Sequence, residues 1–389
     1  MSKALELLAQ WKQDAASIDA EASLAAFGDE VSRGIAGEPA GLPMIRSLEL
    51  PRAGLHRRSG RTVVVDIGGT TLKAAVATVS EAGELSLSDV KTGPVPGLSG
   101  PVTEEAFFKS ICRFAGIDRT TANLAVSFSH NMRVFPGFDG EITGWCKEIT
   151  VTDPGVFTIA GLFRRIAGNP ELNVRVTNDS VASMLGAVGD FRPGDTVLGL
   201  VTGTGFNICW VAPSGTIYNT EAGDSRAFEP GLADRLVDLK SDLPGTALCE
   251  KKTSGVYLAK IISTCLDEAR KRKLPVDPAS VGLDLRAYTA LTDDYSSVFT
   301  GEALERSAKI AAICCEALIR RSASFAPSAD SAARPRVIIA TEGSVINAAE
   351  NYKMRFVRWL KALDGGVHEI ELVSADLAGL RGAARLMDL

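Results

Sequence analysis

The 389-residue chain has few histidines and aromatic residues, and its cysteines form no Cys-x-x-Cys motif. It contains 3 His and 6% aromatic residues. Its 7 cysteines are scattered, with no Cys-x-x-Cys pair and no histidine at metal-ligand spacing, so the sequence carries no signature of a metal centre. We therefore expect reduced thiols in a cytoplasmic protein.

The chain also lacks long apolar runs and an excess of positive charge. No apolar run approaches the ~18 residues of a membrane span, and charged residues interrupt the first 34 residues, which a secretory signal would not tolerate. Lys and Arg total 42 against 47 Asp and Glu, a net charge of -5. We expect neither a membrane nor a nucleic-acid partner, because binding a phosphate backbone needs concentrated basic residues.

The remaining composition is that of a globular protein, with 46% apolar and 23% charged residues. Strand-like and helix-like segments alternate, which predicts an α/β fold of two or three domains. Periodicity predicts helices in residues 1–34, 304–325 and 346–363, and a strand over 337–340. The basic run 270–273 is interpreted as the solvated end of a helix.

Two segments place glycine and threonine between β-rich runs. They are residues 63–79, with a turn at 68–71, and residues 197–211, with a turn at 203–205. Each predicts a hairpin. Facing each other, two such turns could hold a polyphosphate through backbone N–H groups, whereas each turn alone could equally be a structural hairpin that needs positive φ. A P-loop or nicotinamide-binding fold is disfavoured, since neither motif occurs.

Two carboxylates follow predicted strands. Asp66 ends the first strand, where a hard oxygen ligand could hold Mg²⁺ through water. Asp179 ends strand 174–179 and is the candidate general base for an attacking hydroxyl. The alternative is that Asp179 only shares capping of the next helix with Ser180.

The order of these segments resembles the hexokinase family, which are ATP-dependent sugar kinases of the actin-like ATPase fold. Residues 66–73 resemble the first phosphate motif, and Asn178-Asp179-Ser180 resembles Asn-Asp-Thr, whose Asp is the family's base. The other matching segments are Ser-Phe-Ser at 127–129, Trp-Cys-Lys at 145–147, Gly-Thr-Gly at 203–205 with Asn207, Asn-Thr-Glu at 219–221, Glu-Lys-Lys-Thr-Ser-Gly at 250–255 (Glu-Lys-Met-Thr-Ser-Gly in the family) and Glu-Gly-Ser-Val at 342–345.

The resemblance implies a two-lobed actin-like ATPase (ribonuclease H-like) α/β fold with an active-site cleft between the lobes. The small lobe would comprise residues 56–179 and 376–389, and the large lobe residues 1–55 and 180–375. The sugar would be held by Ser127, Cys146, Lys147, Asn178, Asp179, Asn207, Glu221 and Glu250. ATP with Mg²⁺ would be held by Asp66 (through water to the metal), Gly68, Gly69, Thr70, Thr71, Lys73, Gly203, Thr204, Gly205, Gly343 and Ser344.

The implied activity is phosphorylation of a hexose at its 6-hydroxyl, with glucose as the first candidate and Asp179 as the base. The departures from the family pattern that bear on activity are Thr71 for Asn, Lys73 for Arg, Ser129 for Pro, Cys146 for Thr and Glu342 for Asp. Cys146 is a weaker hydrogen-bonding group than threonine. Two alternatives therefore stay open: a kinase for fructose, mannose or an amino sugar, and a sugar-binding sensor with little activity. The sequence leaves the oligomeric state open.

Overall fold

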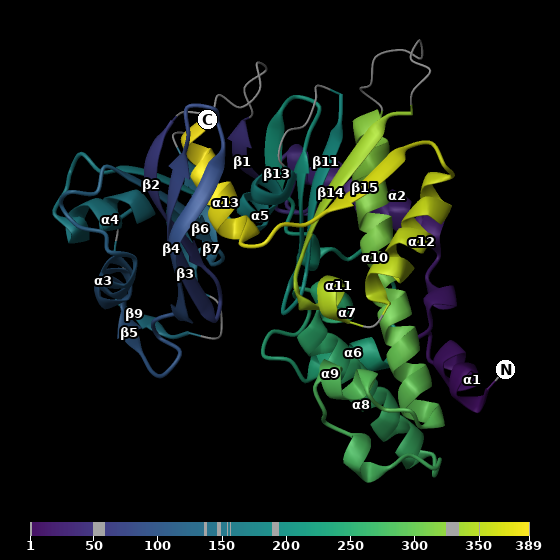
Figure 1. Cartoon of the computed structure of the whole chain (residues 1–389). Coiled ribbons are helices and arrows are strands. Elements are labelled where there is room, and N and C mark those ends of the chain that lie inside the picture. The colour runs from purple at the N-terminus through teal and green to yellow at the C-terminus, as the bar shows by residue number, and fades with distance from the viewer. Residues whose placement is uncertain are drawn as a thin grey trace. The chain divides into compact units, whose positions relative to one another are not determined.

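The computed structural model describes residues 2–49, 59–135, 138–145, 149–153, 155, 157–188, 194–323, 334–349 and 351–388 (Figure 1). The helices are α1 (Lys3–Gln10), α2 (Ala20–Ile35), α3 (Glu104–Ala115), α4 (Ile159–Ala167), α5 (Asp179–Val188), α6 (Leu232–Leu239), α7 (Glu250–Thr253), α8 (Gly255–Lys271), α9 (Leu285–Thr289), α10 (Asp294–Ala323), α11 (Ser344–Ala348), α12 (Tyr352–Asp364) and α13 (Ala378–Arg385).

The strands belong to two larger sheets and two short pairs. They are β1 (Ile45–Glu49), β2 (Gly60–Ile67), β3 (Thr71–Val79), β4 (Leu85–Pro94), β5 (Val102–Thr103), β6 (Asn123–Phe128), β7 (Asn131–Phe135), β8 (Asp139–Gly144), β9 (Val151–Thr152), β10 (Asn173–Asn178), β11 (Thr196–Thr202), β12 (Phe206–Val211), β13 (Thr216–Asn219), β14 (Arg336–Glu342) and β15 (Glu369–Val373). One sheet has the order β10-β6-β2-β3-β4 and the other β1-β13-β12-β11-β14-β15. The expected α/β class is confirmed.

Helices and strands form two compact units. Unit 1 comprises residues 1–44, 200–210 and 220–371, and unit 2 comprises residues 45–199, 211–219 and 372–389. The lobe boundaries and the cleft that the resemblance implies stay predictions.

In unit 2, helices cover both faces of the five-stranded sheet (Figure 1). One face packs against α3 and α4 through large apolar side chains, among them Phe107, Phe108 and Phe163, which are fully buried. The other face is lined by small residues, including Ala75 and Ala125, and packs against α13. Because these side chains are small, the α13 backbone can approach the sheet closely.

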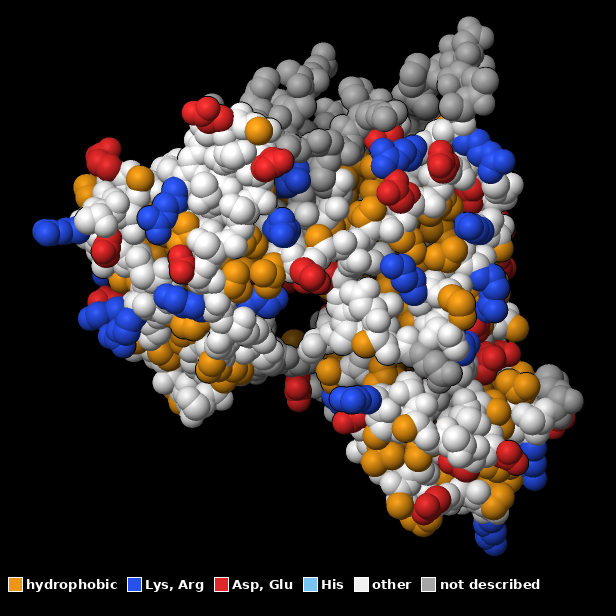
Figure 2. Space-filling view, in the orientation of Figure 1, with side chains coloured by type: hydrophobic (Ala, Val, Ile, Leu, Met, Phe, Trp, Pro, Cys, Tyr) orange, Lys and Arg blue, Asp and Glu red, His pale blue; other side chains and the backbone are white. Residues whose placement is uncertain are grey.

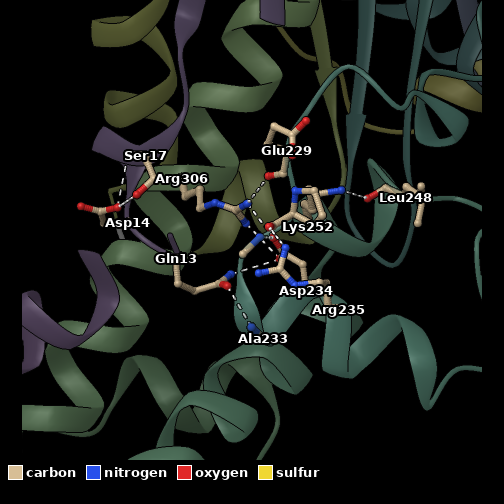
Figure 3. Close-up of polar contacts among 12 residues, drawn as sticks. Gln13, Asp14, Ser17, Glu229, Ala233, Asp234, Arg235, Leu248, Lys252 and Arg306 are labelled. Atoms are coloured by element: carbon tan, nitrogen blue, oxygen red, sulfur yellow. Dashed lines mark hydrogen bonds and ion pairs between the residues drawn. The ribbon is translucent and has the colours of Figure 1, made fainter. Parts of the chain in front are cut away.

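In unit 1, the long helix α10 lies beside α2, α8 and α12 (Figure 1). Its Arg306 is 2% exposed and forms a fork with the equally buried Asp234 of α6, at 3.0 Å and 2.6 Å (Figure 3). Gln13, between α1 and α2, donates its amide N–H to the same carboxylate at 3.1 Å and accepts from the Ala233 N–H at 3.1 Å. This polar cluster joins the N-terminal segment, α6 and α10.

Three helix predictions need correction. The segment 1–34 contains two helices, because Lys12 adopts a left-handed φ of 52° and the Asp19 side chain caps a new helix at α2. The segment 346–363 is likewise divided into α11 and α12, with Asn351 at φ 56° between them. Helix α10 begins at Asp294, ten residues before the predicted start. Strand 337–340 lies within β14, and residues 270–273 lie at the end of α8, as predicted.

The six cysteines in the described part of the chain are all buried. On the face shown in Figure 2, basic and acidic side chains are interspersed among apolar ones. Among the helices that the structure describes, none combines the length and apolar character that crossing a bilayer requires.

Candidate functional site

Three neighbouring parallel strands of unit 2 end at one edge of the sheet. In the β2–β6 register Asp66 lies opposite Ser127, and in the β10–β6 register Asn178 lies opposite Phe128. Asp179, predicted as the last residue of the strand, is instead the first residue of α5. The carboxyl ends of parallel strands are the usual ligand-binding edge of an α/β sheet, so Asp66, Ser127, Asn178 and Asp179 are brought together there.

The Asp66 carboxylate is held from two sides. Ser127 donates its hydroxyl to Oδ1 at 2.7 Å, and the Lys73 ammonium lies 3.5 Å from Oδ2. The Asp66 side chain is 14% exposed. Within the described residues, no group of three or more His, Cys, Asp or Glu side chains could hold a metal ion. The single half-buried carboxylate of Asp66 fits Mg²⁺, which usually keeps several waters and binds substrate phosphates as well.

The start of α5 differs from the sequence prediction. Ser180 does not cap the helix, because it is the second helical residue and itself donates to Asn178. The Asn178 Oδ1 accepts the Ser180 N–H at 2.9 Å and the Ser180 hydroxyl at 2.5 Å. Asn178 therefore supplies the capping oxygen. The Ser180 N–H also lies 2.7 Å from Asp179 Oδ1.

The Asp179 carboxyl group has a raised pKa. Burial raises the pKa of Asp179 above its usual value, and the negative charge of Asp66 raises the pKa further. A hydrogen bond from the Ser129 side chain acts in the opposite direction but does not reverse the shift. A carboxylate with a raised pKa is a better proton acceptor than an ordinary aspartate.

The turn between β2 and β3 is the predicted hairpin. The two strands are antiparallel, with Ile67 opposite Leu72. The Gly68 N–H donates to the Thr71 carbonyl at 3.0 Å, and a Cβ on Gly68 would lie 2.9 Å from that oxygen. Glycine is therefore required by the close approach of the chain, not by the positive φ that the structural alternative assumed. Thr70 is exposed, while Gly68, Gly69, Thr71 and Lys73 are half-buried.

In unit 1, the predicted turn 203–205 lies against the segment that begins α11. The Gly203 N–H donates to the Gly205 carbonyl at 3.0 Å, which closes the turn between β11 and β12. A Cβ on Gly203 would lie 3.1 Å from the Gly343 Cα, and a Cβ on Gly343 would lie 2.3 Å from the Thr202 carbonyl oxygen. Gly343 also has φ 110°, which favours glycine. The two glycine segments thus meet backbone to backbone.

Three of the residues expected to bind sugar lie near the same turn. The Glu250 Oε2 accepts the Phe206 N–H at 3.3 Å, and Asn207 Oδ1 accepts the Ala222 N–H at 3.3 Å. Glu221, which directly precedes Ala222, adopts an uncommon left-handed backbone at φ 53°. The structure therefore brings Asn207, Glu221 and Glu250 together in unit 1, around the start of β12.

A cavity of about 1020 Å³ in unit 1 adjoins this turn. Gly203, Thr204 and Ser344 line it, together with the first turns of α8 and the segment 282–286. Three cations, Lys240, Lys260 and Arg286, lie on its wall, with Asp284 as the acidic group. The cavity is large enough for a mononucleotide and combines apolar walls with cations that suit phosphate.

Some site residues could not be placed, and others were missed. Cys146 and Lys147 lie outside the described residues. Ser129 was not predicted as a site residue, although its side chain forms a hydrogen bond with Asp179. The α8 residues that line the cavity, namely Val256, Ala259, Lys260 and Ser263, were also missed. Their helical spacing was the signal available in the sequence.

No family model matches the chain. Human hexokinase HKDC1 is 25% identical over 289 residues, which cover 66% of this chain and 31% of the human protein. The chain thus spans about a third of that relative's length. A *Schistosoma mansoni* hexokinase complexed with glucose has a TM-score of 0.77 at 18% identity, over 99% of this chain and 98% of that one. A *Streptomyces griseus* ROK family glucokinase in complex with glucose and AMPPNP has a TM-score of 0.51 at 20% identity, over 84% and 99%.

The two solved structures establish the fold of this chain. The match to human hexokinase HKDC1 adds a similarity in sequence. The resemblance to the hexokinase family is therefore confirmed, and the chain has the actin-like ATPase fold.

Proposed function

We propose that this chain is a sugar kinase that transfers the terminal phosphoryl group of ATP to the 6-hydroxyl of a hexose, with glucose as the first candidate. The hydroxyl oxygen forms a bond to the terminal phosphorus, and the bond from that phosphorus to the bridging oxygen of ADP breaks. The hydroxyl proton passes to Asp179. The products are a hexose 6-phosphate and ADP.

The observation that carries this proposal is the environment of Asp179. It stands where β10 ends, beside Asp66 and Ser127 at the ligand-binding edge of the sheet, and burial raises its pKa. Phosphoryl transfer needs a positioned group to accept the proton of the attacking hydroxyl. The named complexes of the *S. mansoni* and *S. griseus* proteins with glucose support a sugar as the acceptor.

ATP is the proposed donor. Support comes from the cavity beside Gly203 and Ser344, from its cations, and from the AMPPNP in the *S. griseus* structure. Mg²⁺ bound with the nucleotide would neutralise phosphate charge, and Asp66 would hold it through water. Lys73, 3.5 Å from Asp66, would add a positive charge at the same edge of the sheet.

The proposed sugar contacts are the side chains of Ser127, Asn178, Asn207, Glu221 and Glu250. A site built from hydroxyl, amide and carboxylate groups rejects sugars that lack a matched hydroxyl. The proposal includes a cytoplasmic location and no nucleic-acid or membrane partner.

The test is an ADP-release assay with purified full chain, ATP and Mg²⁺. Glucose, fructose, mannose, glucosamine and N-acetylglucosamine are each compared with a blank that lacks sugar. We expect turnover well above the blank with glucose. The highest kcat/KM with another sugar would reassign the substrate. Release at the blank level with every sugar, from folded protein that still binds glucose, would contradict the kinase and favour the sugar sensor.

A further inference from the structure

Helix α13 touches the carboxylate that the proposed function assigns to Mg²⁺. An ideal Cβ built on Gly379 would lie 2.9 Å from both Cγ and Oδ2 of Asp66, and 3.1 Å from Oδ1. Since these three distances are nearly equal, a Cβ at position 379 would lie over the flat face of the carboxyl group and clash with it. Residues 66 and 379 are far apart in the sequence, and no motif links them.

The other sides of the same carboxylate are also occupied. Ser127 donates to Oδ1, and Lys73 approaches Oδ2. The third side, the face of the carboxyl group, is kept clear because residue 379 has no Cβ. The orientation that Ser127 and Lys73 hold therefore depends on a glycine at this position.

Helix α13 is itself held in place by α5. A Cβ on Gly382 would lie 1.6 Å from the Ala182 carbonyl oxygen, and a Cβ on Gly186 would lie 2.0 Å from the Ala378 carbonyl oxygen. The two helices thus pack backbone to backbone, and α5 begins with Asp179. On its other side α13 packs against the sheet, through Leu380, Ala383 and Ala384 (Figure 1). The position of Gly379 is consequently set by the rest of unit 2.

We infer that Gly379 is a positioning residue: because it lacks a side chain, it leaves room for the Asp66 carboxylate in the orientation that Ser127 and Lys73 hold. This inference rests on the proposed function for its kinetic consequence, because only a carboxylate that takes part in turnover needs a fixed orientation. Replacement by alanine leaves two outcomes. Either Asp66 turns away from Ser127 and Lys73, or α13 moves off the sheet.

The kinetic test compares the full-length Gly379→Ala variant with the wild type. We expect kcat to fall by about 10- to 100-fold, as for a small misplacement of a catalytic group, and the Mg²⁺ concentration for half-maximal rate to rise. The Kd for glucose, from calorimetry without nucleotide, should stay within about twofold of wild type, since α13 carries no proposed sugar contact. The control is Gly28→Ala on α2, where a Cβ meets no atom within 4 Å; its kinetics should be unchanged. A folded Gly379→Ala variant with wild-type kcat and Mg²⁺ dependence would overturn the inference.

A thermal double-mutant cycle tests the contact without relying on activity. Gly379→Ala should lower Tm in the wild type, but far less in an Asp66→Ala background, where the obstructing carboxyl group is gone. If Gly379→Ala alone does not yield folded protein, adding Asp66→Ala should restore it. Equal losses in both backgrounds, or no restoration, would overturn the inference. Absence of turnover in the wild type would contradict the proposed function instead, and the cycle would still decide the contact.

Discussion

The pKa of Asp179 in unit 2 is raised above its usual value, whereas the pKa of Asp234 in unit 1 is lowered. Burial tends to raise the pKa of both. For Asp234, the charges of Arg306 and Lys252 outweigh burial and lower the pKa, whereas for Asp179 the nearby Asp66 adds to the rise. Asp234 also receives the Arg306 fork, the Gln13 amide and the Gly231 N–H at 2.7 Å.

The difference separates a structural carboxylate from one suited to proton transfer. The Asp234 carboxylate is bound by groups from three segments (Figure 3). Its charge is therefore compensated, and removing a charged partner would destabilise the fold. Asp179 has a hydroxyl and backbone N–H partners but no cation among the causes of its pKa shift. Perturbation of this kind is typical of functional sites.

The largest expected effect is on turnover, through Asp179→Asn. Loss of the base should lower kcat by about 10²- to 10⁴-fold with sugar binding retained. In the wild type, the acid limb of kcat against pH should lie above the ordinary aspartate pKa of about 3.9, since the base must be deprotonated. Steady-state kinetics over a pH series measures both. A variant with near-normal kcat would show that another group accepts the proton.

The same variant should not lose stability at neutral pH. A raised folded-state pKa means that the charged form of Asp179 opposes folding above that pKa, while below the unfolded-state value of about 3.9 this cost is absent. Asp179→Asn should therefore match or exceed the wild-type Tm at pH 7, and the gain should vanish at low pH. A lower Tm at pH 7 would mean that the charge of Asp179 is structural.

The second effect is on stability, through Arg306→Met. It leaves the Asp234 carboxylate buried without its fork, which typically costs about 3–5 kcal/mol of unfolding free energy. Urea denaturation at pH 7 measures the loss. Adding Asp234→Asn should recover part of it, because the stranded charge is removed. A loss below about 1 kcal/mol would show that Gln13 and Lys252 suffice to compensate the carboxylate.

In the wild type, acid should remove the stabilising contribution of the Asp234 charge. Because the folded-state pKa of Asp234 is lowered, its contribution is present above the unfolded-state value of about 3.9 and is lost as the pH falls through the folded-state pKa. The two aspartates thus respond to acid in opposite directions.

The smallest effect is expected for Lys252→Met, which restores the residue of the family motif. Lys252 is 3% exposed and donates to the Leu248 carbonyl at 2.9 Å, but burial lowers its pKa. Asp234 would keep the Arg306 fork, so the unfolding free energy should stay within about 1 kcal/mol of wild type. Lys252→Gln, which keeps a donor, is the matched variant. A loss above 3 kcal/mol from methionine alone would make Lys252 an essential partner of Asp234.

Local features of this fold could be predicted from the sequence. The hairpins at residues 68 and 203 and the strand ending before Asp179 depend on neighbouring residues, so glycine and β-branched patterns reveal them. Asn178 was not predicted as the cap in place of Ser180, because both residue types favour caps and only the helix start distinguishes them.

Long-range partners could not be predicted. Asp66 meets Gly379, and Asp234 meets Gln13 and Arg306, across separations that no local pattern encodes. The motif at 250–255 likewise gave no reason for a lysine at position 252. Its neighbours Asp234 and Arg306 become visible only when α6, α7 and α10 are packed together.

The burial of the cysteines has a practical consequence for chemical labelling. Only a thiolate reacts rapidly with alkylating reagents, and burial raises the pKa of Cys112 to about 11 and the pKa values of Cys265 and Cys315 further still. In the folded chain these thiols are therefore shielded both sterically and electronically. Their rate of alkylation reports how often each region opens, with Cys112 as a reporter for unit 2 and Cys265 and Cys315 as reporters for unit 1.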